Sequence, residues 1–158
     1  MFFIELESEQ RRIYLNTCQV YQAFCETLQQ VQHNQGGMRW KKNGDKDYLF
    51  KTRDGRGNGK SMGVRNTQTE AIYSAFHQQK QQTKQRLSEL QTALTRQAKL
   101  AVAININRVP KTAANVVRVL DRAGLLGHGL TVLGTHALYA YEAAAGLQFD
   151  SGLLATMD

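Results

Sequence analysis

Two features near the C-terminal end of the sequence could do chemistry together. Gly134 and Thr135 lie between an apolar run and a helix-forming segment, and Asp158 follows a second apolar-leaning run, Leu-Leu-Ala-Thr-Met. A helix N-terminus presents free backbone N–H groups and the positive end of the helix dipole, which favour phosphate. Glycine lets a phosphate approach the backbone, and a threonine hydroxyl can cap the helix or bond a phosphate oxygen. A Gly-Thr pair before a helix is more often an ordinary tight turn with an N-cap.

Asp158 has two interpretations. A carboxylate in or at the end of a buried strand is costly unless it is paired, hydrogen-bonded or bound to a metal. If Asp158 faces the Gly134-Thr135 turn, a phosphate and a divalent cation could share the gap between them. The alternative is a chain end in water.

The elements that must position these residues begin at about residue 111. The pattern predicts a helix over 112–123, a buried strand at 130–134, a helix from Thr135 and a strand leading to Asp158. This order is the opening of an α/β domain. Four apolar residues of the first helix are expected to point inward: Ala113, Val116, Val117 and Leu120.

The preceding part of the chain predicts two long helices that flank a small sheet. Apolar residues at helical spacing indicate a helix from Ser8 to about Asn34, and turn residues separate three strands at about 38–42, 46–53 and 60–65. A capping box at Thr67 and Glu70 opens a second long helix, to about Leu100. The predicted fold is therefore α+β and mainly helical. Residues 1–108 form a helical hairpin with a β meander, and residues 109–158 begin a second domain.

The meander carries most of the excess positive charge of the chain, which has a net charge of +7. Residues 38–66 contain nine basic side chains and three acidic ones. They could be solvated lysines that prevent edge-to-edge pairing of sheets. They could also contact a nucleic-acid backbone, with Trp40 or Tyr48 available to stack on bases. The candidate contacts are Arg39, Lys41, Lys42, Lys51, Arg53 and Lys60.

The remaining features favour a folded protein of a reducing compartment. Cys18 and Cys25 lie seven residues apart in a helix, too far for a mutual disulfide. We expect no signal peptide and no membrane span, and hence a cytoplasmic protein. The long helices could also pair two copies of the chain as a homodimer.

The segments GTHALYAYEAAAG and FDSGLLATMD resemble the start of the nucleotidyltransferase fold shared with DNA polymerase beta, in a bacterial branch related to abortive-infection toxin transferases. The meander and GKSMGVRNTQTEAIY also look like the N-terminal region of this branch. The resemblance implies that Gly134 and Thr135 bind the phosphates of an NTP. It implies that Asp158 is a catalytic, metal-binding acid, the first of an Asp-x-Asp pair that holds Mg²⁺ or Mn²⁺.

The sequence departs from that family pattern in its acidic residues. The resemblance calls for a second acid two residues after Asp158 and a third on a later strand, and the 158 residues contain neither. One carboxylate cannot hold two ions, so we expect a chain truncated within the motif and inactive alone. When complete, it would transfer a nucleoside monophosphate from an NTP to a nucleic-acid, protein or other acceptor. The alternative is a non-catalytic module that binds nucleic acid or a partner through the basic meander.

Overall fold

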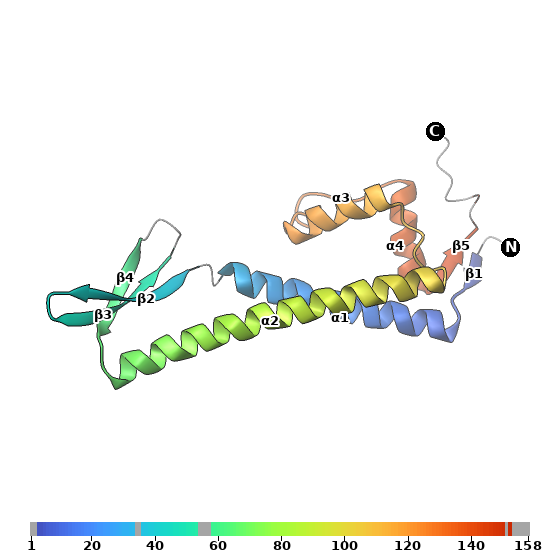
Figure 1. Ribbon diagram of the computed structural model, residues 1–158. Coiled ribbons are helices and arrows are strands. Elements are labelled where there is room, and N and C mark those ends of the chain that lie inside the picture. Colours follow the sequence, from blue (N-terminus) through green and yellow to red (C-terminus); the bar gives the residue numbers. More distant parts are fainter. Residues whose placement is uncertain (1–2, 34–35, 54–57, 151, 153–158) are drawn as a thin grey trace. The chain divides into compact units, whose positions relative to one another are not determined.

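The computed structural model describes residues 3–33, 36–53, 58–150 and 152 (Figure 1). Helices dominate, and the strands form two small antiparallel sheets, which confirms an α+β, mainly helical fold. None of the helices in the described ranges is long and apolar enough to cross a membrane. The elements in chain order are β1 Phe3–Glu5, α1 Ser8–His33, β2 Gly37–Asn43, β3 Lys46–Thr52, β4 Gly59–Val64, α2 Thr67–Ala103, α3 Lys111–Arg122, α4 Thr135–Ala145 and β5 Leu147–Phe149.

The chain divides into two compact units. The first unit joins Met1–Tyr21 to Ala93–Asp158, and the second unit is Gln22–Thr92. Both boundaries fall inside helices, so α1 and α2 each contribute to both units.

The second unit contains the predicted β meander. The strands follow the order β2-β3-β4, and Gly44, with a positive φ of 61°, closes the turn between β2 and β3. Trp40 pairs with Leu49 across β2 and β3. The register shifts between Leu49 and Phe50, where β3 pairs with β4. The turn residues between the strands therefore predicted this meander correctly.

One face of this sheet packs against the first turns of α2. The rings of Trp40 and Tyr73 lie 5.6 Å apart, and the Lys51 ammonium lies 6.0 Å from the ring centre of Phe76. His77 Nε2 lies 3.1 Å from the Met38 carbonyl oxygen. Leu49 is fully buried in this layer, so part of the core of the second unit lies between the sheet and α2.

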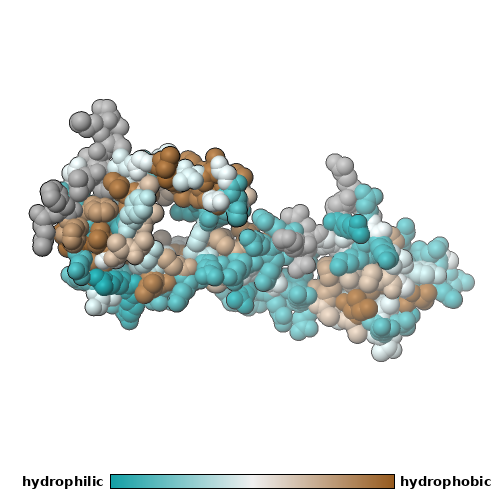
Figure 2. All heavy atoms as spheres, turned by 180° about the vertical axis from the view of Figure 1, so that it is seen from behind, coloured by the Kyte–Doolittle hydropathy of each residue, from teal (hydrophilic) through white to brown (hydrophobic). Residues whose placement is uncertain are grey.

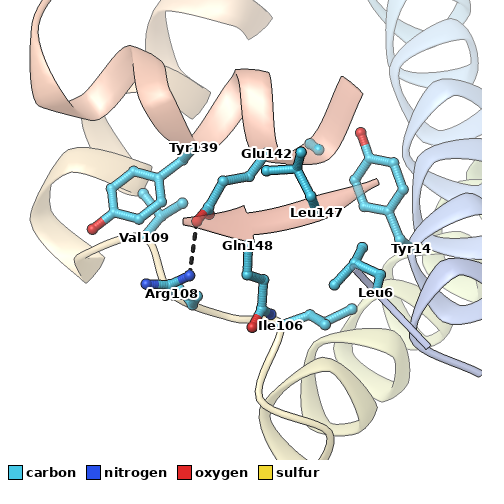
Figure 3. Close-up of a pocket in the computed structure, with 10 residues that line it drawn as sticks. Leu6, Tyr14, Ile106, Arg108, Val109, Tyr139, Glu142, Leu147 and Gln148 are labelled. Carbon is cyan, nitrogen blue, oxygen red and sulfur yellow. Dashed lines mark hydrogen bonds and ion pairs between the residues drawn. The ribbon is translucent and has the colours of Figure 1, made fainter. Parts of the chain in front are cut away.

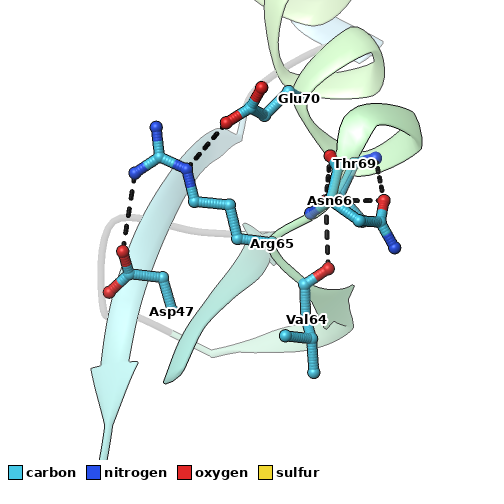
Figure 4. A network of polar contacts seen from close by, with 6 residues as sticks. All are labelled: Asp47, Val64, Arg65, Asn66, Thr69 and Glu70. Carbon is cyan, nitrogen blue, oxygen red and sulfur yellow. Dashed lines mark hydrogen bonds and ion pairs between the residues drawn. The ribbon is translucent and has the colours of Figure 1, made fainter. Parts of the chain in front are cut away.

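The capping box that opens α2 is shifted by one residue from the predicted one (Figure 4). Asn66 is the capping residue: its Oδ1 accepts from the Thr69 N–H at 2.9 Å, and Thr69 Oγ1 accepts from the Asn66 N–H at 2.8 Å. Glu70 instead accepts from Arg65 Nε at 2.8 Å. Thr67 is therefore the first residue of the helix rather than its cap, and the predicted pairing of Thr67 with Glu70 was wrong.

The first unit is closed by a sheet that the sequence did not predict. β1 pairs with β5 in antiparallel fashion, with Phe3 opposite Phe149 and Glu5 opposite Leu147. The Leu6 N–H extends the pairing by donating to the Gly146 carbonyl at 3.0 Å. Gly146 adopts the left-handed conformation that ends α4, and this allows the chain to turn directly into β5.

The strand predicted at 130–134 is absent from the structure. Leu130 forms an isolated bridge with Leu126, and the residues from 131 to 133 are irregular. A strand needs a partner for its backbone groups, and the apolar run alone could not supply one. The strand predicted to lead to Asp158 lies outside the described residues.

The helix predicted at 112–123 is α3, one residue earlier. Within Lys111–Arg122 no residue is buried, and Val116, expected to point inward, is 55% exposed. Ala113, Val117 and Leu120 are partly buried, so they define the inner side of this helix.

Candidate nucleotide site

Gly134 lies immediately before α4 and has a backbone conformation that favours glycine. Its φ is 77°, and a Cβ built on it would meet no atom of the described residues within 4 Å. The Ala137 N–H donates to the Gly134 carbonyl at 2.9 Å, which begins the helix. The space beside the Gly134 Cα is therefore open among the described residues.

Thr135 is the first residue of α4 and does not cap it. Gly134 occupies the capping position, and no side chain of the described residues makes a capping hydrogen bond there. The Thr135 side chain is partly buried and makes no capping hydrogen bond. The first backbone N–H groups of α4 therefore have no side-chain acceptor among the described residues. Gly134 therefore holds the capping position that Thr135 was expected to be able to fill, and the role of both residues in phosphate binding stays a prediction.

An open groove of about 880 Å³ lies within the first unit, lined by residues of α1, α3 and α4 and of the segments between them. It includes His136 and Ala137 from the first turn of α4, so it adjoins Gly134 and Thr135. Figure 2 shows apolar side chains of this unit gathered around a hollow. The volume is in the range of small-molecule sites.

The groove has one strongly polar part. Arg118 and Asp121 of α3 line it, and the Tyr21 hydroxyl donates to the Asp121 carboxylate. Arg118 donates to the Asn115 side chain at 3.0 Å. Of the two tyrosines of α4, Tyr139 is partly buried, whereas Tyr141 is 63% exposed.

A buried ion pair fixes the other end of α4 (Figure 3). Arg108 Nη1 donates to Glu142 Oε1 at 2.7 Å and to the Phe149 carbonyl at 2.9 Å. The same Glu142 oxygen accepts from the Phe149 N–H at 2.6 Å, and the Glu142 side chain is 8% exposed. One carboxylate therefore ties α4, β5 and the segment before α3 together.

No sequence pattern predicts this pair. Arg108 lies 34 residues from Glu142, and neither residue belongs to a sequence motif that distinguishes it from other charged residues. A bond from the Gln148 side chain to the Asn105 carbonyl at 3.0 Å reinforces the same junction. The pair lines a small pocket together with Tyr14 and Tyr139. Its hydrogen bonds join the segment before α3 to α4 and β5.

Tyr14 of α1 lines both the groove and the small pocket, and its environment disfavours the tyrosinate. Burial, followed by a hydrogen bond with Cys18, raises the pKa of Tyr14 to about 12. An unfolded tyrosine ionises near pH 10. The neutral phenol of Tyr14 thus contributes stability that is fully present below about pH 10 and is lost as the pH rises towards 12.

We expect an absorbance titration of the tyrosinate band to show a late step near pH 12 that Tyr14→Phe removes. The loss of stability between pH 10 and 12 should also become shallower in that variant. Tyr141→Phe, at the exposed tyrosine of α4, is the control and should retain the late step. A late step that persists in Tyr14→Phe would refute the assignment.

No metal site is present in the part of the chain that the structure describes. No group of three or more His, Cys, Asp or Glu side chains there could hold an ion. Asp158 lies outside that part, so its predicted catalytic and metal-binding roles remain predictions. Cys18 and Cys25 are free, as expected, and Cys18 is exposed.

The candidate nucleic-acid contacts lie in the second unit, and the sheet separates them by face. Lys51 packs over Phe76 on the face that α2 covers, and Lys42 follows Trp40 on that same face by alternation along β2. Lys60 is opposite Lys51 and shares its face, whereas Arg39 and Lys41 point to the other face. Arg53 is exposed just after β3.

Comparison with known proteins gave one match. Residues 111–158 match a family model described as a nucleotidyltransferase. The match begins at α3 and includes Gly134, Thr135, Glu142 and Asp158. No curated protein and no solved structure matches the chain. The C-terminal third of the chain is thus nucleotidyltransferase-like.

Proposed function

We propose that the first unit binds a nucleoside triphosphate as part of a nucleotidyltransferase. The observation that carries the proposal is the family match over residues 111–158, which includes the turn that opens α4. Gly134 and Thr135 would receive the phosphates on the N–H groups of α4, where the helix dipole favours negative charge. The adjoining groove would accommodate the rest of the nucleotide.

Asp158 is assigned to the metal by the family resemblance. It would hold Mg²⁺ or Mn²⁺, which when bound offsets the charge of the phosphates. Transfer to an acceptor would use the further carboxylates that the resemblance calls for. The step proposed for these 158 residues themselves is therefore binding of the nucleotide.

Substitution of Gly134 tests the proposal. Gly134→Val places a branched side chain where the phosphate must approach the backbone, so we expect affinity for magnesium NTPs to fall at least tenfold. The measurement is isothermal titration calorimetry with each of the four common NTPs. Equal affinities of Gly134→Val and the parent chain would rule out phosphate binding at this turn.

Gly127 offers a matched control for the backbone strain. It has the same φ of 77°, and a Cβ built there also meets no atom of the described residues within 4 Å. Gly127→Val therefore also places a β-branched residue at a positive φ, but without blocking a helix N-terminus. We expect NTP affinity to stay within about twofold of the parent in this variant, given the absence of any proposed phosphate contact.

A further inference from the structure

The sheet of the second unit has a face that α2 does not cover. Met38, Trp40 and Lys51 contact α2, and alternation along the strands directs their neighbours to the opposite side. The Lys41 ammonium confirms this, since it lies 5.7 Å from the ring centre of Phe50, two positions from Tyr48 on β3. We name this side the open face, and its residues are Arg39, Lys41, Lys46, Tyr48 and Phe50.

The open face combines aromatic rings with cations. Arg39 is opposite Phe50, and Lys41 is opposite Tyr48, so each ring has a basic side chain directly across the strand pair. Both rings are partly exposed, and the three basic side chains are exposed. The rings are two residues apart on β3, a rise of about 7 Å along the strand.

The positive charge of the open face is not neutralised within the described residues. None of the ion pairs found there involves Arg39, Lys41 or Lys46. Asp47 points to the covered side and pairs with Arg65 at 3.5 Å. Asp47 thus forms its ion pair on the covered face, and the cations of the open face have no ion-pair partner among the described residues.

Trp40, the other aromatic residue considered for stacking, is occupied. Its ring lies against Tyr73, and the Arg65 guanidinium carbon lies 5.0 Å from its ring centre. Hydrogen bonding to Glu70 raises the pKa of that Arg65 guanidinium, so the cation persists under all ordinary conditions. Trp40 is therefore part of the packing against α2, and the rings on the open face are Tyr48 and Phe50, the latter in contact with the Lys41 ammonium.

We propose that the open face binds single-stranded nucleic acid. Tyr48 and Phe50 stack on two bases of the strand, and Arg39, Lys41 and Lys46 contact its phosphates. Unpaired bases present the ring faces that stacking needs, whereas the bases of a duplex are already stacked on one another. An acidic peptide could satisfy the cations but would leave the two rings without stacking partners.

Anisotropy of fluorescently labelled 12-nucleotide oligo(U) and oligo(dT), measured with the full chain, tests the proposal. We expect Tyr48→Val and Phe50→Val each to weaken binding at least fivefold, since stacking contributes on the order of this factor per base. With three phosphate contacts, affinity should fall about 20-fold between 50 and 200 mM salt. A duplex of the same length should bind more weakly than either single strand.

Adjacent lysines of β2 provide the matched control, because Lys41 lies on the open face and Lys42 on the covered face. Lys41→Gln should weaken binding about threefold at 50 mM salt, and Lys42→Gln should change it less than 1.5-fold. Trp40 fluorescence confirms that each variant folds. Equal effects of the two lysine variants, or unchanged binding in both ring variants, would overturn the proposal, as would preference for the duplex or for an acidic peptide.

Discussion

Glu142→Ala is expected to lower the free energy of unfolding of the first unit by about 3 kcal/mol, because it leaves the Arg108 charge partly buried without its partner. The Arg108 side chain is only 23% exposed, so water can replace only part of the hydrogen bonding and charge stabilisation that the Glu142 carboxylate provides. The Phe149 N–H also loses its acceptor. Urea denaturation followed by far-ultraviolet circular dichroism measures the change, and hydrogen exchange of the Phe149 amide should accelerate with it.

The chain contains a matched surface pair for comparison. Arg12 and Glu9 lie at the same separation of 2.7 Å, but the Arg12 side chain is 69% exposed and the Glu9 side chain 52%. We expect Glu9→Ala to change the free energy of unfolding by less than about 1 kcal/mol, since water screens an exposed pair. Similar losses in Glu9→Ala and Glu142→Ala would show that burial does not set the strength of the Arg108–Glu142 pair.

Leu49→Ala is expected to lower the free energy of unfolding of the second unit by about 3 kcal/mol, within the range for a buried leucine that leaves a cavity. Leu49 is 0% exposed and stands opposite Trp40 in the register of β2 and β3. Trp40 is the single tryptophan of the chain, so its fluorescence reports unfolding of this unit.

Met62→Ala is the control for that experiment. Met62 lies on β4 of the same sheet and is 42% exposed, so its truncation removes little buried surface. We expect a loss below about 1 kcal/mol. If the two variants shifted the Trp40 transition equally, the core of the second unit would have to lie elsewhere than between the sheet and α2.

Local signals in the sequence were sufficient for the long helices and the meander. The stripe of apolar residues from Ile13 to Val31 and the Asn43-Gly44 turn act within a few residues, and both predictions were confirmed. The capping box was displaced because Asn66-Thr67-Gln68-Thr69-Glu70 contains two overlapping registers. Arg65 pairs with Glu70, which leaves Asn66 and Thr69 to cap the helix.

Tertiary partners decided the features that the sequence did not predict. The run at 130–134 has strand composition, but no described strand pairs with it, whereas the short β5 gained its partner from β1 at the other end of the chain. Glu142 binds both Arg108 and the Phe149 N–H because α4 ends at Gly146, where the chain turns back along the helix into β5. Gly134 and Thr135 could be proposed as phosphate-binding candidates from the sequence, since a glycine before a helix is a local signal.

The pairing of β1 with β5 has a consequence for any attempt to isolate the nucleotidyltransferase-like segment. That segment begins at Lys111, yet Phe3–Glu5 and Arg108, both outside it, hold its strand β5 and its helix α4. A fragment cut at residue 111 would carry the sequence signature without the partners that its backbone requires. The segment of sequence similarity and the unit of folding therefore have different boundaries, and a fragment made for expression should follow the boundaries of the folding unit.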